Sequence, residues 1–170
     1  MLDAPIALRP ARPADAEAIA AIYAESVARG DVTLDPRPLP AQRFFDEIAG
    51  ADPAVVVVVA EEGDQVVGWG RLKPWSDRPG YRVAAEISIY VRADRARRGL
   101  GRALTDQLRK RAPTAGYHHL VARIIAGNAP SERLFAAAGF EVVGTQREVG
   151  WTGTRFIDVV LLQCLVAQAA

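Results

Sequence analysis

Between a predicted strand and a strongly patterned helix, the chain reads Arg97-Arg98-Gly99-Leu100-Gly101-Arg102. Glycine lets a backbone approach a ligand closely and adopt angles that other residues avoid. The first amides of a helix have no partner inside it, and the helix dipole makes this end positive. Nearby arginines add charge that suits phosphate oxygens. The segment therefore predicts a site for phosphate or pyrophosphate, although its glycines could instead only end a strand and admit a helix.

Two other phosphate-binding motifs do not fit this segment. A dinucleotide-binding fingerprint needs a third glycine where Leu104 stands. A P-loop needs Gly-Lys followed by Ser or Thr, whereas this chain reads Gly101-Arg102-Ala103. The ligand class therefore has to be sought in the surrounding elements.

Outward from this segment, hydrophobic periodicity predicts a mixed α/β sheet flanked by helices. Leu100, Leu104 and Leu108 share one face of a helix, and the valine run over 55–59 suits a strand buried on both sides. The predicted order is β-α-α-β-β-β-α-β-α-β-β, in a single domain over residues 1–170. Strands are expected at 6–9, 55–59, 65–73, 83–91, 119–125, 141–149 and 156–165, and helices at 13–29, around 44–48, and at 97–111 and 130–138.

Composition limits the class of protein. The 170 residues carry a formal net charge of +1, which gives no general attraction to nucleic acid or to an anionic membrane. No apolar run approaches the roughly 20 residues of a membrane-spanning helix, and Met1–Pro5 lacks the basic start of a signal peptide. The single cysteine, Cys164, is expected to be inert core packing. These observations favour a cytoplasmic protein without nucleic-acid or membrane partners.

The order of elements, the loop at 97–102 after the fourth strand and Asn128-Ala129-Pro130-Ser131 after the fifth together resemble the GNAT superfamily of acetyl-CoA-dependent N-acetyltransferases. The resemblance covers residues 6–165. In that family the fourth and fifth strands splay apart, and the pantetheine arm of acetyl-CoA lies in the gap like an extra strand. The same splayed arrangement is therefore expected here.

The resemblance also implies which residues bind the cofactor. Asn128, helped by Ser131, would hydrogen-bond the pantetheine arm, although both residues could only cap a helix. The family usually carries Gln or Arg where this chain has Ala96, so one side-chain contact is expected to be weaker. The backbone of Ile89, Tyr90 and Val91 would pair with the pantetheine, and the pyrophosphate would be held by the amides of Arg97, Arg98, Gly99, Leu100, Gly101 and Arg102.

Glu86 is the candidate for the chemistry. At neutral pH an amine is mostly protonated, and the ammonium form has no lone pair to attack a thioester. Acetyl transfer therefore needs a base that removes this proton. Glu86 begins the strand that would bind pantetheine, and a charged residue entering an apolar strand is costly unless it is paired or useful. The alternative is an exposed glutamate on the outer face of that strand.

A narrower resemblance concerns Pro74-Trp75-Ser76-Asp77-Arg78-Pro79-Gly80-Tyr81, the pair Ala85-Glu86 and the ending Asp158-Val159-Val160-Leu161-Leu162-Gln163. These segments are similar to the phosphinothricin acetyltransferase branch, which includes enzymes acting on methionine sulfoximine. The resemblance implies that Glu86 is the general base and that Arg78 and Tyr81 face the substrate, beside Trp75. The planar fork of Arg78 could clamp a carboxylate or phosphinate. Arg78 could instead be solvated, and Trp75 and Tyr81 could simply pack the loop.

One departure concerns the general acid. Many members of the superfamily carry a tyrosine, and some phosphinothricin acetyltransferases a histidine, where this chain has Phe135. Phe135 has no proton to give, so water or another group would protonate the departing thiolate. His118 and His119 are adjacent and would point to opposite faces of a strand, so no metal is expected.

The sequence thus predicts an N-acetyltransferase that moves acetyl from acetyl-CoA to the primary amine of an amino-acid-like small molecule carrying a carboxylate. One alternative is a protein N-terminus, polyamine or aminoglycoside as acceptor, for which an acidic pocket would be expected. Another is a CoA-binding regulatory domain without turnover. Members of the branch are commonly dimers, so a homodimer is also expected.

Overall fold

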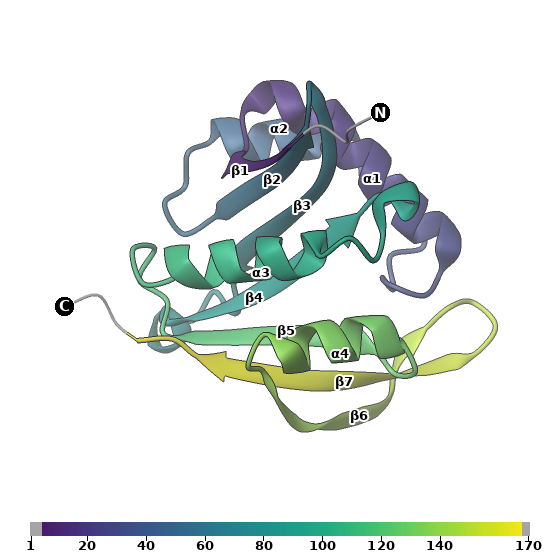
Figure 1. Ribbon diagram of the computed structural model, residues 1–170. Coiled ribbons are helices and arrows are strands. Elements are labelled where there is room, and N and C mark those ends of the chain that lie inside the picture. Colours follow the sequence, from purple (N-terminus) through teal and green to yellow (C-terminus); the bar gives the residue numbers. More distant parts are fainter. Residues whose placement is uncertain (1–4, 168–170) are drawn as a thin grey trace.

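The computed structural model describes residues 5–167, so the ends of the predicted domain, including Met1–Ala4, lie outside the described residues. The helices and strands follow the predicted order (Figure 1). The strands are β1 (Ile6–Pro10), β2 (Val56–Glu62), β3 (Gln65–Pro74), β4 (Ala84–Val91), β5 (His119–Ile125), β6 (Glu141–Trp151) and β7 (Phe156–Leu165). The helices are α1 (Ala16–Arg29), α2 (Ala41–Ala49), α3 (Leu100–Arg111) and α4 (Ala129–Ala137).

Within residues 5–167, the strands form one seven-stranded sheet in the order β1-β2-β3-β4-β5-β7-β6. Neighbours in this order are antiparallel except β4 and β5, which are parallel. Figure 1 shows β4 and β5 diverging along their length. On their other sides, β4 stays paired with β3 and β5 stays paired with β7. The predicted mixed α/β sheet with a splayed fourth and fifth strand is therefore confirmed.

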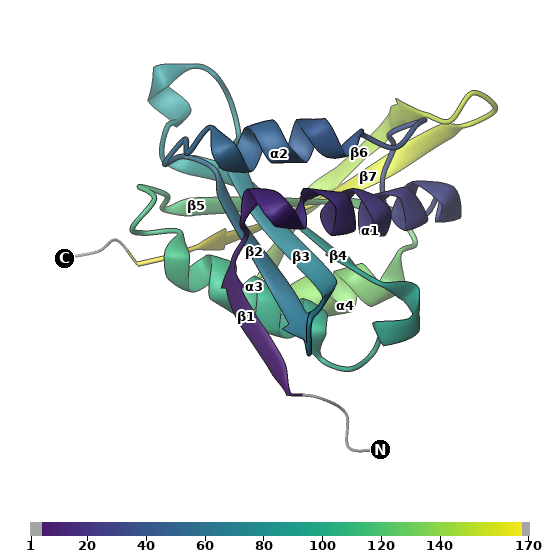
Figure 2. The same cartoon turned by 90° about the horizontal axis from the view of Figure 1, so that it is seen from above.

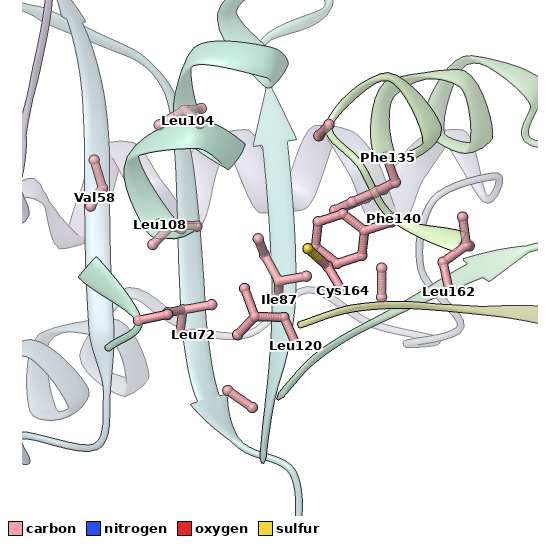
Figure 3. Close-up of a cluster of buried hydrophobic side chains, with 14 of the residues drawn as sticks. Val58, Leu72, Ile87, Leu104, Leu108, Leu120, Phe135, Phe140, Leu162 and Cys164 are labelled. Carbon is pink, nitrogen blue, oxygen red and sulfur yellow. The ribbon is translucent and has the colours of Figure 1, made fainter. Parts of the chain in front are cut away.

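Helices cover both faces of the sheet, α1 and α2 on one and α3 and α4 on the other (Figures 1 and 2). On the second face, Leu100, Leu104 and Leu108 are all buried, as their helical spacing predicts. Figure 3 shows two of these leucines beside β3 and β4, with Phe135 and Cys164 farther along the same core. The expectation that Cys164 is core packing is confirmed, since it is 4% exposed.

The core under α1 and α2 is built on aromatic rings. Trp69 of β3 is fully buried and stacks on Tyr90 of β4, with ring centroids 4.7 Å apart. Phe44 of α2 meets Trp69 edge-on at 5.4 Å, and Tyr23 of α1 meets Tyr90 edge-on at 5.1 Å. This cluster fixes α1 and α2 over the end of β4.

Two helices begin later than the sequence predicts. The third helix begins at Leu100 because Arg97 (φ 62°) and Gly99 (φ 80°) have left-handed backbone angles, which a right-handed helix excludes. The first begins at Ala16, after a single 3₁₀ turn at Pro13–Asp15. No helix in residues 5–167 is both long enough and apolar enough to cross a membrane.

Candidate active site

The gap between β4 and β5 forms the main concave feature of the site. In the described part of the chain, the two strands pair only at Ala84 with His119, Ala85 with Leu120, and Glu86 with Val121. Beyond Glu86 the edge of β4 faces the gap, and an open strand edge carries N–H and C=O groups that can pair with an extended ligand. A cavity of about 330 Å³ lies at this gap.

The cavity walls come from segments far apart in the sequence. Ile89 and Tyr90 line it, as do Asn128 and Ser131 at the start of α4, whereas Val91 lies outside the lining. The loop over 32–35, between α1 and α2, closes one side. That loop is tied to α4, because the Asn128 Nδ2 donates to the carbonyl of Asp31 at 2.9 Å.

Asn128 also caps its own helix. Its Oδ1 accepts a hydrogen bond from the amide of Ser131 at 3.1 Å, so the capping role that the sequence left open is present. The Asn128 side chain therefore uses Oδ1 to cap α4 and Nδ2 to hold the loop on the other side of the cavity. A contact with a bound molecule would have to share these partners.

At the other end of the gap, α3 presents its first turn. The amides of Leu100, Gly101 and Arg102 have no carbonyl one turn earlier within the helix. Gly99 takes a left-handed angle that glycine tolerates best. Gly101 has another reason to be glycine, since a Cβ there would lie 3.0 Å from the Leu134 Cδ2 of α4. One glycine therefore shapes the turn, and the other lets α3 approach α4.

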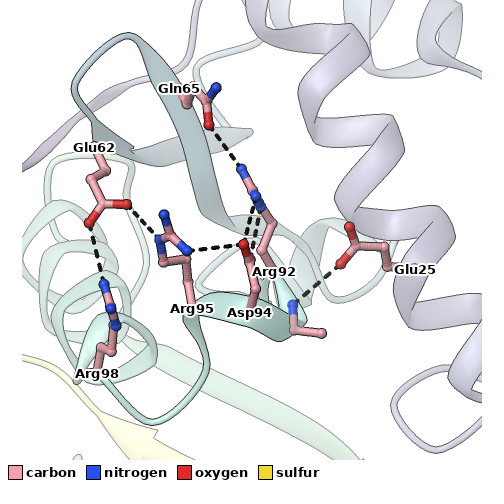
Figure 4. Close-up of polar contacts among 8 residues, drawn as sticks. Glu25, Glu62, Gln65, Arg92, Asp94, Arg95 and Arg98 are labelled. Atoms are coloured by element: carbon pink, nitrogen blue, oxygen red, sulfur yellow. Dashed lines mark hydrogen bonds and ion pairs between the residues drawn. The ribbon is translucent and has the colours of Figure 1, made fainter. Parts of the chain in front are cut away.

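Three arginines near this turn pair with acids of the same chain, and two of these, Arg95 and Arg98, are drawn in Figure 4. Glu62, at the end of β2, accepts from the Arg95 Nε at 2.6 Å and from the Arg98 Nη1 at 3.4 Å. Arg102 pairs with Asp106 one turn later, at 2.7 Å. These ion pairs hold the guanidinium groups of Arg95, Arg98 and Arg102 beside the turn.

Glu86 lies at the point where β4 and β5 part and lines the cavity. Its side chain is 13% exposed, so it does not stand free on an outer face. The Arg123 Nη2 donates to both carboxylate oxygens at 2.9 Å, and the Lys73 Nζ lies 3.5 Å from Oε2. The carboxylate is therefore set at the fork of the gap and held by two cations.

The three residues expected to face a substrate are placed differently from one another. The Trp75 ring lies over the guanidinium of Arg123, 5.8 Å from Cζ, which brings it next to the partner of Glu86. Arg78 and Tyr81 stand at a short 3₁₀ turn over 79–81, outside the cavity lining, and Tyr81 is 51% exposed. Trp75 is also outside the cavity lining, and among the described residues it is connected to Glu86 only through Arg123.

Several lining residues were not singled out from the sequence. Tyr23 donates a hydrogen bond from its hydroxyl to Asp35, and burial, followed by this bond, raises the pKa of Tyr23 above its ordinary value. Burial raises the pKa of Tyr90 to about 12, so its hydroxyl stays protonated at neutral pH. Arg123 carried a usable signal, since it is a charge inside the apolar strand His119–Ile125.

Phe135 lines the cavity from α4, at the position where the resemblance leads us to expect a proton donor. It is 5% exposed and packs edge-on against Phe140, with centroids 5.0 Å apart. The Phe135 ring therefore packs in the hydrophobic core and also forms part of the cavity wall. Within residues 5–167, no group of three or more His, Cys, Asp or Glu side chains could hold a metal ion.

Comparisons with known proteins agree with this geometry. The family model described as "Acetyltransferase (GNAT) domain" matches residues 8–161. The L-methionine sulfoximine/L-methionine sulfone acetyltransferase of Pseudomonas aeruginosa is 33% identical over 159 residues, covering 92% of each protein.

Two solved structures with acetyl-CoA are similar throughout. A Salmonella typhimurium protein in complex with its cofactor acetyl-CoA has a TM-score of 0.90 at 30% identity, over 97% of this chain and 96% of that one. A Sinorhizobium meliloti phosphinothricin acetyltransferase in complex with acetyl-CoA has a TM-score of 0.87 at 30% identity, over 95% and 89%. The chain therefore belongs to the GNAT family of acetyltransferases, among the relatives named for methionine sulfoximine and phosphinothricin, and is an acetyl-CoA-dependent N-acetyltransferase.

Proposed function

We propose that the protein acetylates the primary amine of an amino-acid-like small molecule that carries an acid group, as methionine sulfoximine and phosphinothricin do. The observation that carries this proposal is the position of Glu86, at the fork of β4 and β5 and on the wall of the cavity. The names of the relatives support the substrate class. The cationic side chains on the wall, Arg71, Lys73 and Arg123, suit an acid better than a polyamine.

Acetyl-CoA would occupy the gap as the family resemblance implies. The free edge of β4 at Ile89, Tyr90 and Val91 would pair with the pantetheine arm, and the first turn of α3 would receive the pyrophosphate. Asn128 and Ser131 would hold the arm from the other side of the gap. This placement brings the thioester toward the fork, where Glu86 lies.

The reaction then needs a single direct transfer. Glu86 takes a proton from the substrate ammonium, directly or through one water, and the freed amine attacks the thioester carbonyl. A C–N bond forms, the C–S bond breaks, and the CoA thiolate leaves. The attacking nitrogen still has one proton to lose, and since Phe135 has no proton to give, water in the open gap passes that proton from the nitrogen to the thiolate. Trp75, Arg78 and Tyr81 would contact the substrate at the mouth of the site.

The test is a thiol-release assay with acetyl-CoA and a panel of amines. The panel contains methionine sulfone, methionine sulfoximine and phosphinothricin, together with spermidine, an aminoglycoside and a peptide with a free N-terminus. Release with the amino-acid analogues supports the proposal. Release only with the cationic amines or the peptide assigns another acceptor. Binding of CoA without release from any amine would indicate a regulatory domain.

The two hydrogen bonds of Asn128 lead to a prediction with two matched variants. Asn128→Asp keeps the cap on Ser131 and loses the donor to Asp31, whereas Asn128→Ala loses both. We expect the KM for acetyl-CoA to rise by up to about tenfold in both variants, because each loses the amide donor. The free energy of unfolding should fall by about 1 kcal/mol more in Asn128→Ala than in Asn128→Asp, because only the alanine variant also loses the cap. An unchanged KM in Asn128→Asp would assign the Nδ2 group to folding alone.

We also propose that the protein is a homodimer that uses the β6–β7 hairpin. β6 is an edge strand, and the hairpin exposes apolar side chains that a lone chain leaves in water. Trp151 and Phe156 pack on each other with centroids 4.8 Å apart and are 54% and 62% exposed. The other exposed apolar residues of the hairpin are Val142, Val143, Val149 and Leu165.

Light scattering on a sizing column tests the dimer. The wild type is expected at twice the chain mass of 18.3 kDa. The double variant Trp151→Ser, Phe156→Ser should move toward the monomer mass, because it removes the largest apolar area of the hairpin. Phe45→Ser, which alters an exposed ring on α2, is the control and should leave the mass unchanged. A wild-type monomer would contradict the proposal.

A further inference from the structure

Arg123 is a cation in the middle of an apolar strand. Its neighbours Ala122 and Ile124 are buried in the core under α3 and α4. Alternation along β5 therefore sends the Arg123 side chain to the opposite face, where it lines the cavity. A charge at such a position is costly unless it is paired or used.

The guanidinium of Arg123 binds Glu86 through two of its three nitrogens. Nη2 and Nε donate to the carboxylate of Glu86, at 2.9 Å and 3.2 Å. Among the described residues, Nη1 donates no hydrogen bond, and the side chain is 48% exposed. The ring of Trp75 covers one face of the guanidinium. Nη1 is therefore open to a second oxyanion, which its N–H groups can bind with charge-assisted hydrogen bonds.

The charges around Glu86 favour such an anion. Arg71 is already paired with Glu47 of α2, at 2.9 Å. Lys73 and Arg123 share the single carboxylate of Glu86, so one positive charge beside it is unbalanced. The other acid of the cavity wall, Asp35, accepts a hydrogen bond from Tyr23 instead. An acid group on the substrate would complete the pairing.

We infer that Arg123 determines specificity for amines that carry an adjacent carboxylate, an inference that rests on the proposed function. Nε and Nη2 of its guanidinium hold Glu86, and Nη1 binds the carboxylate of the substrate. In an α-amino acid a single carbon separates carboxylate and amine, so the bound carboxylate places the amine beside the base. Arg78, outside the lining, is then left for a group at the far end of the substrate side chain.

The test compares two substrates that differ only in this carboxylate, methionine sulfone and its α-amide. Arg123→Gln should lower kcat/KM for the acid by about 100-fold, mainly through KM, because the charge-assisted hydrogen bonds to the substrate carboxylate are lost. For the amide the change should stay within about threefold. Arg123→Lys, which keeps the charge without the fork, should fall between the two. Each substrate is compared across variants, so the different basicity of the two amines cancels.

Arg133→Gln is the matched control, since Arg133 is exposed on α4 outside the cavity lining, and both substrates should be unaffected. Equal losses of kcat/KM for acid and amide in Arg123→Gln would mean that Arg123 only holds Glu86. An unchanged kcat/KM for both would mean that Arg123 neither holds Glu86 nor binds the carboxylate. Both results overturn the inference. A wild type that acetylates neither substrate refutes the proposed function instead. Calorimetry with CoA present then decides about Arg123: acid binding that is lost in Arg123→Gln supports its role, and equal binding overturns it.

Discussion

Replacing Glu86 with Gln is expected to lower kcat at least about 100-fold while the Kd for acetyl-CoA stays unchanged, because the carboxylate acts as the base and the cofactor is held elsewhere. Gln keeps the size of the side chain and one acceptor oxygen for Arg123. The two cations beside it remain solvated, since Lys73 is 39% and Arg123 48% exposed. The free energy of unfolding should therefore change by less than about 1 kcal/mol. Thiol release at saturating amine gives kcat, and calorimetry gives the Kd.

Glu141→Gln is the control for this experiment. Glu141 is an exposed residue of β6 whose Oε1 accepts from the Gln163 Nε2 at 3.0 Å, away from the cavity lining. The same chemical change there should leave kcat and Kd as they are. An unchanged kcat in Glu86→Gln would remove Glu86 as the base. A weaker Kd with normal kcat would instead make it part of the cofactor site.

The fold was predictable because its signals are local. The leucines at four-residue spacing in α3 and the valine run of β2 each identify an element without reference to the rest of the chain. The helix starts were less accurate, since the left-handed angle of Arg97 depends on how the turn meets the neighbouring strand and helix. A non-glycine residue in that region has no sequence signal of its own.

The site was predictable only in part. Glu86 was predicted because it is a charge in an apolar strand and because the family resemblance implies a base there, and Arg123 carries the same charge signal one strand later in the sheet. Their pairing joins residues 37 positions apart and depends on the register of β4 against β5, which periodicity does not determine. The loop over 32–35 is held beside the cavity by a hydrogen bond between Asn128 and Asp31, which are 97 positions apart in the sequence. Such long-range contacts are properties of the folded chain.

The wall of the cavity opposite α4 depends on the aromatic cluster, and Phe44 is its anchor in α2. Phe44 is 2% exposed and meets Tyr23 at 5.8 Å and Trp69 at 5.4 Å. Trp69 in turn stacks on Tyr90, and both tyrosines line the cavity. Removing the Phe44 ring would leave a hole between α2 and the sheet that rigid neighbours fill only in part.

Phe44→Ala is therefore expected to lower the free energy of unfolding by about 3–5 kcal/mol, which corresponds to a melting temperature roughly 6–20 °C lower. The neighbouring Phe45 offers the matched control, because it lies on the same helix with 43% of its surface exposed. Phe45→Ala should change the free energy by about 0.5 kcal/mol or less. Denaturation is measured at one fixed protein concentration, since any self-association would add to apparent stability. Similar losses of stability in the two variants would show that helix propensity, and not the aromatic core, holds α2 over the site. Equal stability of the wild type and Phe44→Ala would show that the aromatic cluster does not contribute to stability.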